Sequence, residues 1–211
     1  ETTGFSPVTN RIIEIGAVKV ENGEITERFS TFVNPQVPIP FHIEKLTSIN
    51  DSMVMDADPI EVVLPQFLEF VGDAILVAHN ANFDVSFIKE NAKRQGIPVD
   101  FTYVDTVGIA RALLTGQSKY TLDAVAKTLG ISLENHHRAV DDAECTAEIF
   151  VKFIEMLKKD NILDLASLNE LGKSSVEAIR KLHSYHIIIL AKNGTNQPVQ
   201  TGIRVPSDIF P

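Results

Sequence analysis

The sequence predicts an α/β domain in which a mixed β-sheet is flanked by helices. Two observations lead to this prediction: a β-hairpin near the start, and short apolar strands that alternate with helical segments further on. The hairpin consists of a β-branched run over 11–20, the dipeptide Asn22-Gly23, which is the strongest short hairpin signal, and a returning strand over 25–33. A hairpin followed by alternating strands and helices is typical of a layered domain with a mixed sheet.

The segment after the hairpin is expected to be helical but interrupted. Three prolines between 35 and 40 predict a stiff loop, and 41–49 is predicted to be a short helical or irregular segment. Residues 59–71 have helical spacing, but Pro65 lies within them. Proline removes a backbone donor and clashes with the preceding turn, so a kink or a break is expected there.

The second half of the chain alternates strands with helices. The apolar run 75–78 suits a strand buried on both faces, and 101–105 is a second short strand. Helices are predicted from the segment 79–84 to about Arg94, and over 107–114 and 121–129. After a loop over 130–136, a long amphipathic helix starts near Ala139. Its apolar residues recur at three- and four-residue spacing: Val140, Ala143, Ala147, Phe150, Ile154 and Leu157.

The 211 residues are predicted to form one domain with an appendage. The domain covers 1–159, and 160–182 is read as a helical extension of two short helices. Residues 183–211 contain an expected edge strand at 186–190 and a polar tail. Because this strand and tail lack partner elements of their own, they are assigned to a neighbouring domain.

Composition limits the classes of protein to consider. Apolar residues make up 44% of the chain without a run near twenty, so neither a membrane span nor a membrane partner is expected. The single cysteine, Cys145, lies in a predicted helix, which is consistent with a reducing cytoplasm. The net charge of −9 argues against broad electrostatic binding of a nucleic-acid backbone. It still allows a pocket in which carboxylates bind metal ions and the metal ions meet a phosphate.

The stretch 136–144 is the strongest candidate for chemistry. Asp142 lies in the first turn of the predicted long helix, beside its apolar stripe, where the helix dipole favours a negative charge. His137 is five residues earlier, so it must reach this carboxylate from the preceding loop. Taken alone, the stretch also fits an ordinary acidic helix start with a solvated histidine pair before it.

Other carboxylates are expected to converge on the same crevice. Asp84 and Asp105 follow predicted strands, and ligands of α/β sheets bind outside the carboxyl ends of the strands. Asp84 could equally be a helix cap. Clustered carboxylates repel one another unless a hard divalent cation holds them, and two such ions about 4 Å apart can activate a water and stabilise a leaving oxygen. A nearby histidine could accept the proton of that water. A serine nucleophile and a zinc site are less consistent with the motifs present.

Three blocks resemble the motifs of the DEDD exonucleases of the histidine subtype, in order and in separation. They are Glu1-Thr2-Thr3-Gly4, His79-Asn80-Ala81-Asn82-Phe83-Asp84 and His137-Arg138-Ala139-Val140-Asp141-Asp142. The resemblance spans 1 to about 158 and implies a ribonuclease H-like fold and a 3′→5′ exonuclease that uses two Mg²⁺ or Mn²⁺ ions. Within the family it is closest to the proofreading exonucleases of PolC-type bacterial replicative polymerases.

The resemblance also implies roles for individual residues. Glu1 and Asp142 would bind the first metal ion, Asp84 the second, and His137 would be the general base. The residues implied in contact with the terminal sugar or base, or in shaping the pocket, are Thr2, Thr3, Gly4, Leu46, Thr47, Ile49, Asn80 and Phe83. For Phe83 a core aromatic is the commoner role, and His79 and Asp105 are interpreted as structural or supporting.

The chain departs from the family pattern at its start and at Ser48. The first family block reads Asp-x-Glu, whereas this chain begins at the glutamate. An aspartate that bridges both metal ions, and most of a central strand, are therefore expected before residue 1. Metal binding, activity and sheet stability are expected to suffer without them. Ser48 stands where such sequences often have glycine.

The expected function is removal of 3′-terminal nucleotides from single-stranded or frayed DNA, with the other domains of a parent polymerase as partners. Two alternatives stay open from the sequence. One is a stand-alone repair or RNA-trimming exonuclease, and the other is a structural module whose active site has lapsed.

Overall fold

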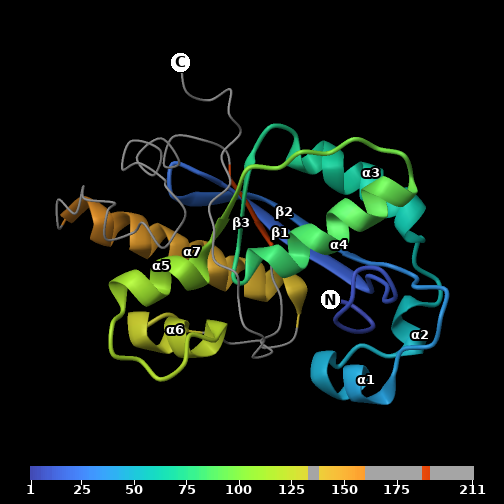
Figure 1. Ribbon diagram of the computed structural model, residues 1–211, viewed down its shortest axis with the longest axis horizontal. Helices are drawn as coiled ribbons and strands as arrows, with labels where there is room; N and C mark the ends of the chain where they lie inside the picture. The colour runs from blue at the N-terminus through green and yellow to red at the C-terminus, as the bar shows by residue number, and fades with distance from the viewer. Residues whose placement is uncertain (133–137, 160–186, 191–211) are drawn as a thin grey trace.

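A computed structural model describes residues 1–132, 138–159 and 187–190 of the chain (Figure 1). His137, the predicted helical extension over 160–182 and the tail after 190 lie outside these residues. The described strands form one mixed sheet in the order β2-β1-β5-β3-β4. The predicted fold class is confirmed, because this sheet with helices on both sides is the ribonuclease H-like arrangement.

The predicted hairpin is present. Strands β1 (Glu14–Glu21) and β2 (Glu24–Phe32) pair antiparallel. Asn22 and Gly23 both have positive φ, 55° and 87°, which is the type I′ turn that matches the twist of the two strands. The strand begins three residues later than predicted, because residues before Glu14 pair with the start of the chain: Thr2 bridges to Ile12.

The strand predicted at 186–190 is central in the sheet, so the prediction of an edge strand is wrong. β5 (Ile187–Leu190) pairs antiparallel with β1 and parallel with β3 (Ile75–Ala78), which in turn pairs parallel with β4 (Tyr103–Asp105). β5 lies opposite 17–20 of β1, whereas the first residues of the chain lie opposite 11–14. Two distant segments therefore share one edge of β1. The assignment of 183–211 to a neighbouring domain stays a prediction.

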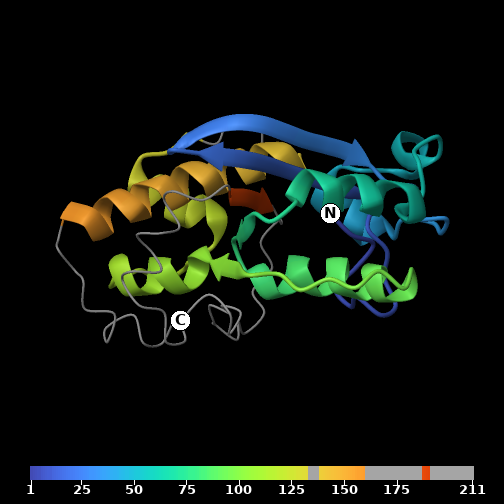
Figure 2. The same ribbon diagram turned by 90° about the horizontal axis from the view of Figure 1, so that it is seen from above.

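Helices cover both faces of the sheet. Helices α5 (Thr106–Leu113), α6 (Leu122–Leu129) and α7 (Ala139–Lys159) lie on one side of the strands in Figure 1, and α3 (Ile60–Val71) and α4 (Ala81–Arg94) on the other. Figure 2 shows α7 running beneath the hairpin. Alternate residues of β1 point to opposite faces, so Val18 and Val20 join the core under α7, whereas Ile15 and Ala17 join the core under α3 and α4.

Two short helices follow the proline-rich loop. α1 (Phe41–Thr47) and α2 (Asp51–Val54) enclose a third small core. α2 was not predicted, although Asn50 provides a recognisable cap, since its side chain accepts a hydrogen bond from the Met53 amide.

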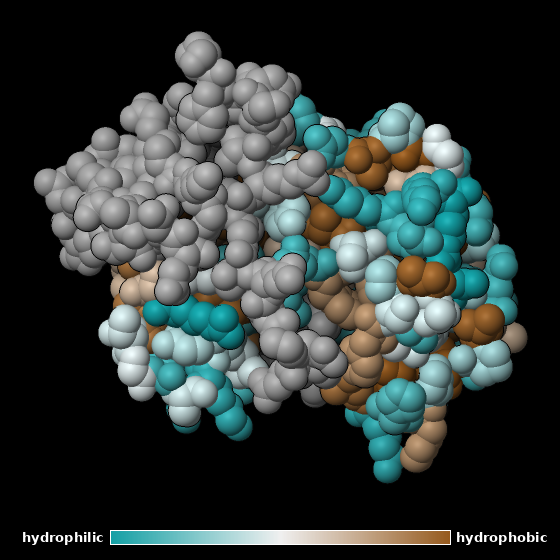
Figure 3. Space-filling model, in the orientation of Figure 1, coloured by the Kyte–Doolittle hydropathy of each residue, from teal (hydrophilic) through white to brown (hydrophobic). Residues whose placement is uncertain are grey.

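Helix α3 runs from Ile60 to Val71 without interruption, so the predicted break at Pro65 is absent. Pro65 lies on the exposed side, where water can satisfy the carbonyl that loses its helical partner. In the part of the chain that the structure describes, no helix combines the length and the apolar character needed to cross a bilayer. On the face shown in Figure 3, hydrophobic side chains occur as separate patches among hydrophilic ones over α3, α4 and α1, as is ordinary for a protein surface.

Candidate active site

One pocket collects residues from the start of the chain, the start of β1 and the start of α4. Its acidic lining residues are Glu1, Glu14 and Asp84, and Phe83 and Phe87 provide apolar walls. Glu1 and Asp84, which are predicted site residues far apart in sequence, therefore share one cavity. Asp84 is the fourth residue of α4, and its carboxylate lies in the first turn, where the helix dipole favours negative charge.

Glu1 is fixed by the chain that leads into β1. Its carbonyl oxygen accepts hydrogen bonds from the amides of Ile13 (2.8 Å) and Glu14 (3.4 Å), and its own nitrogen donates to the Glu14 carbonyl (2.6 Å). The Thr3 amide continues this pairing by donating to the Arg11 carbonyl at 2.8 Å. The backbone of Glu1 is thus held as an added stretch of strand beside β1.

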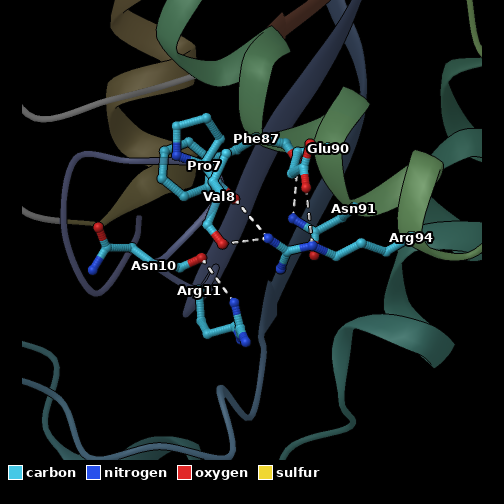
Figure 4. Close-up of polar contacts among 8 residues, drawn as sticks. All are labelled: Pro7, Val8, Asn10, Arg11, Phe87, Glu90, Asn91 and Arg94. Carbon is cyan, nitrogen blue, oxygen red and sulfur yellow. Dashed lines mark hydrogen bonds and ion pairs between the residues drawn. The ribbon is translucent and has the colours of Figure 1, made fainter.

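The loop that follows Glu1 is tied to helix α4, as Figure 4 shows. The Arg94 guanidinium donates through Nη2 to the carbonyls of Pro7 (3.2 Å) and Val8 (2.5 Å), and through Nε to Glu90 at 3.2 Å. Arg94 is the last residue of α4, whereas Asp84 lies in its first turn. These contacts therefore tie the loop after Glu1 to the helix that carries Asp84.

The start of α4 is organised by Asp105. Oδ1 of this buried carboxylate accepts hydrogen bonds from the amides of Asn80 (3.0 Å) and Val107 (2.9 Å). Asn80 adopts the left-handed conformation, φ 73°, that turns β3 into α4. Burial raises the pKa of Asp105, and the backbone hydrogen bonds oppose this rise. These contacts agree with the interpretation of Asp105 as a supporting residue.

Asp142 is the fourth residue of α7, and its side chain is almost fully buried. Its pKa is raised to about 7, mainly by burial and in addition by the nearby charges of Glu1 and Asp141. Oε1 of Glu1 and Oδ2 of Asp142 are both buried, and neither has a hydrogen-bond partner among the described residues. Two neighbouring buried carboxylates that repel each other are costly without a cation.

These observations fit a divalent cation at the Glu1–Asp142 pair, since hard cations prefer carboxylate oxygens. Within 1–132, 138–159 and 187–190, no three histidine, cysteine, aspartate or glutamate side chains are already gathered as a complete ligand set. His137, the predicted base, lies outside the described residues.

Glu14 is a site residue that the sequence reasoning missed. Its side chain is 1% exposed. Oε1 accepts from the Arg138 guanidinium (Nη2 2.9 Å, Nε 3.0 Å), and Oε2 accepts from the Ala139 amide at 3.1 Å. The available signal was an acid inside the β-branched run Ile-Ile-Glu-Ile, where a strand would bury it.

The residues predicted to touch the terminal nucleotide differ in exposure. Thr47 and Ile49 are buried beside the small core of α1 and α2, so Leu46, which is half-buried, offers the accessible surface of the three. Phe83 packs against Phe87 with ring centroids 4.9 Å apart and still lines the pocket. The remaining members are partly exposed (Thr2, Asn80) or buried (Thr3, Gly4). Their contacts with a nucleotide stay predictions.

His79 has the contacts of a structural residue. Its ring nitrogens lie 2.9 Å from Oγ1 of Thr106 and 2.8 Å from the carbonyl oxygen of Tyr120. Burial lowers its pKa to about 4, so the ring is neutral near pH 7. This agrees with the interpretation from sequence.

Comparison with known proteins settles the family. The family model described as Exonuclease matches residues 1–150. The chain belongs to the Exonuclease family. Exonucleases of this family use divalent metal ions. The predicted membership among DEDD exonucleases of the histidine subtype is confirmed.

Individual members of the family show how far the similarity reaches. The chain is 53% identical over 205 residues to a DNA polymerase III PolC-type of Clostridium perfringens, covering 97% of this chain and 14% of that protein. The chain thus spans about a seventh of the PolC-type relatives it matches. A solved structure of Exonuclease X in complex with 5′ overhanging duplex DNA is 27% identical, covers 87% of this chain and 95% of its own, and has a TM-score of 0.62. The nuclease domain of 3′hExo, a DEDDh family member bound to rAMP, shares the fold at 19% identity and a TM-score of 0.62, covering 70% of this chain and 82% of its own.

Proposed function

We propose that this exonuclease chain removes 3′-terminal nucleotides from single-stranded or frayed DNA, as the proofreading module of a bacterial replicative polymerase in the cytoplasm. The observation that supports this most directly is the pair formed by buried Asp142 and half-buried Glu1, beside a pocket that Glu1 shares with Asp84. The 53% identity to a PolC-type polymerase favours DNA and a polymerase partner over the two alternatives left open by the sequence.

In this proposal Glu1 and Asp142 hold one Mg²⁺ or Mn²⁺ ion, and Asp84 holds a second. When bound, a pair of such ions stabilises both the attacking and the leaving oxygen of a phosphodiester. The role of the chain is to hold these carboxylates close together in spite of their mutual repulsion, and a bound cation would favour their ionised form. His137 accepts the proton of the attacking water, for which its reference pKa near 6.5 is suited.

The remaining pocket residues orient the strand end. Thr2, Thr3 and Gly4 contact the terminal sugar through the backbone, which is held beside β1. Leu46 packs on the terminal base, with Thr47 and Ile49 supporting it from the core of α1 and α2. Asn80 and Phe83 shape the opposite wall at the start of α4.

The test is nucleotide release by the full-length protein from a 5′-labelled single-stranded DNA oligonucleotide with Mg²⁺. We expect stepwise shortening from the 3′ end with release of nucleoside monophosphates, and loss of this shortening on addition of EDTA. A matched RNA oligonucleotide distinguishes the RNA-trimming alternative. Absence of Mg²⁺-dependent shortening of both strands, in a protein that is folded by circular dichroism, would favour a lapsed site.

A further inference from the structure

The first turn of α7 lies directly against β1, and Gly16 makes this approach possible. A Cβ atom added at Gly16 would lie 2.2 Å from the carbonyl carbon of Ala139 and 2.3 Å from the backbone nitrogen of Val140. Real Cβ atoms essentially never come so close to backbone atoms. The helix start therefore occupies the space that a side chain at position 16 would fill.

Glu14 fastens the same helix start two residues earlier along β1. Its carboxylate accepts the Ala139 amide, which belongs to the first turn and has no helical acceptor of its own. Its other oxygen accepts two donors of Arg138, the residue before α7. The Arg138 guanidinium also lies over the Phe32 ring of β2 at 4.9 Å. The two residues before and at the start of α7 are thus fixed to the hairpin.

The backbone of Glu14 holds the other half of the acid pair. Its carbonyl accepts the Glu1 nitrogen at 2.6 Å, and its amide donates to the Glu1 carbonyl at 3.4 Å. The same residue therefore contacts Glu1 through its backbone and the helix that carries Asp142 through its side chain. Both of its carboxylate oxygens accept hydrogen bonds from Arg138 and Ala139, so its contacts differ from those of the predicted metal ligands.

We propose that Glu14 is the positioning residue of this site: it sets Asp142 and Glu1 at a fixed separation by docking α7 onto β1, with Gly16 as the contact point. This inference rests on the proposed function for its effect on catalysis, but the docking itself does not. Without the carboxylate, the first turn of α7 loses its anchor, and Asp142 loses its fixed relation to Glu1.

The test compares Glu14→Gln with Glu144→Gln in the full-length protein. Glu144 is a matched control, because it lies on the same helix and pairs with Arg28 of β2 at 2.5 Å, but is only partly buried and lies outside the pocket. For Glu14→Gln we expect amide hydrogen exchange over 139–142 to be about 3- to 10-fold faster, which is the factor that the loss of one hydrogen bond would produce. We expect Mn²⁺ binding about 10-fold weaker, by analogy with residues that orient metal ligands.

The kinetic readout separates positioning from general destabilisation. We expect kcat to fall about 100-fold on the single-stranded oligonucleotide, with KM within about 3-fold, because misplacement of reacting groups by an ångström costs about this much. If Glu14→Gln does not fold, Arg138→Ala replaces it. This variant removes the exposed partner of the same carboxylate, and we expect the same changes in smaller measure.

Two results overturn the proposal. One is exchange, Mn²⁺ affinity and kcat that match those of Glu144→Gln. The other is faster exchange across all helices with no excess at 139–142, which would make Glu14 a general stability residue. Failure of the proposed function looks different: the unmodified protein would release no nucleotide, while Glu14→Gln would still speed exchange at 139–142.

Discussion

The first turns of α4 and α7 are held in the same way, each by a carboxylate from a neighbouring strand, but the two carboxylates have different surroundings. Each helix begins at the candidate site, and each carries an aspartate as its fourth residue, Asp84 or Asp142. In each, a buried carboxylate from a strand accepts one backbone amide at the helix start: Asp105 at the end of β4 accepts the Asn80 amide before α4, and Glu14 at the start of β1 accepts the Ala139 amide of α7. An acidic residue on a strand thus positions the helix that carries each candidate aspartate: Asp105 for Asp84, and Glu14 for Asp142.

The difference lies in how the supporting acid is compensated. Asp105 receives only backbone donors through Oδ1, and burial raises its pKa. Glu14 receives a guanidinium in addition to an amide, and uses both oxygens. Burial and the nearby carboxylates of Glu1, Asp141 and Glu14 together raise the pKa of Asp142, which α7 carries, to about 7. The mutual repulsion of carboxylates is therefore seen at the start of α7, where a bound cation would offset it.

The largest expected effect is loss of catalysis when either helix-borne acid is neutralised. Asp142→Asn and Asp84→Asn should each lower kcat by about 1,000-fold or more, since each removes several kcal/mol of charge stabilisation. Asp141→Asn, beside Asp142 but half-exposed, is the control and should stay within about 10-fold. The measurement is nucleotide release with Mg²⁺. Equal activity of Asp142→Asn and Asp141→Asn would contradict the assignment of Asp142.

The pH dependence of the free energy of unfolding, measured without metal ions, should reveal the raised pKa of Asp142 at the start of α7. The folded-state pKa of Asp142, about 7, exceeds the ordinary aspartate value of 3.8, so the folded protein binds more protons and its free energy of unfolding falls as pH rises from about 4 to 7. This contribution amounts to a few kcal/mol, since one pKa unit is about 1.4 kcal/mol. His79, with its pKa lowered to about 4, acts in the opposite direction between about 4 and 6.5.

The informative quantity is therefore the difference between the unmodified protein and Asp142→Asn in urea unfolding at pH 5 and pH 8, with EDTA. We expect Asp142→Asn to be the more stable of the two at pH 8 and to lose most of this advantage at pH 5. An equal difference in free energy of unfolding at pH 5 and at pH 8 would show that Asp142 is ionised at both, and would contradict its raised pKa.

Much of this fold was predictable because its signals are local. The hairpin depends on Asn22-Gly23, and α7 on a periodic apolar stripe over twenty residues, so neither needs distant contacts to be recognised. The pairing of β5 with β1 joins residues about 170 positions apart, and nothing in an apolar run of four residues states which strands will flank it.

The candidate site divides in the same way. Glu1, Asp84 and Asp142 could be proposed from motif order, whereas Glu14 was hidden in an apolar run and gains its role only when α7 packs onto it. Likewise the burial of Thr47 and Ile49 depends on how α1 and α2 fold over Ile13. A residue whose role depends on contact with a distant helix cannot be recognised from the spacing of residues in its own segment.

A stability comparison of Glu14→Gln and Asp105→Asn should show which supporting acid matters more. One oxygen of Asp105 accepts both amides, and asparagine keeps such an oxygen, so we expect a loss of about 1 kcal/mol or less. Glutamine at position 14 must place its amide group against Arg138 or Ala139, which leaves a donor facing a donor and should cost about 2–3 kcal/mol. Chemical denaturation at pH 7 measures both. A larger loss for Asp105→Asn than for Glu14→Gln would show that the supporting acid at α4 contributes more to stability than the one at α7.

The smallest expected effect concerns the more solvent-accessible ion pair between α7 and β2. Glu144 also joins α7 to the hairpin, since it accepts from Nε of Arg28 on β2, but the two side chains are 33% and 55% exposed. Solvent screens such a pair, and surface ion pairs contribute about 0–1 kcal/mol, so Glu144→Gln should change the free energy of unfolding by about 0.5 kcal/mol or less. The measurement is denaturation at low and at high salt, in parallel with Glu14→Gln. If salt erased the effect of Glu14→Gln as well, its carboxylate would behave as a surface charge, and the docking of α7 would depend on Gly16 and apolar packing alone.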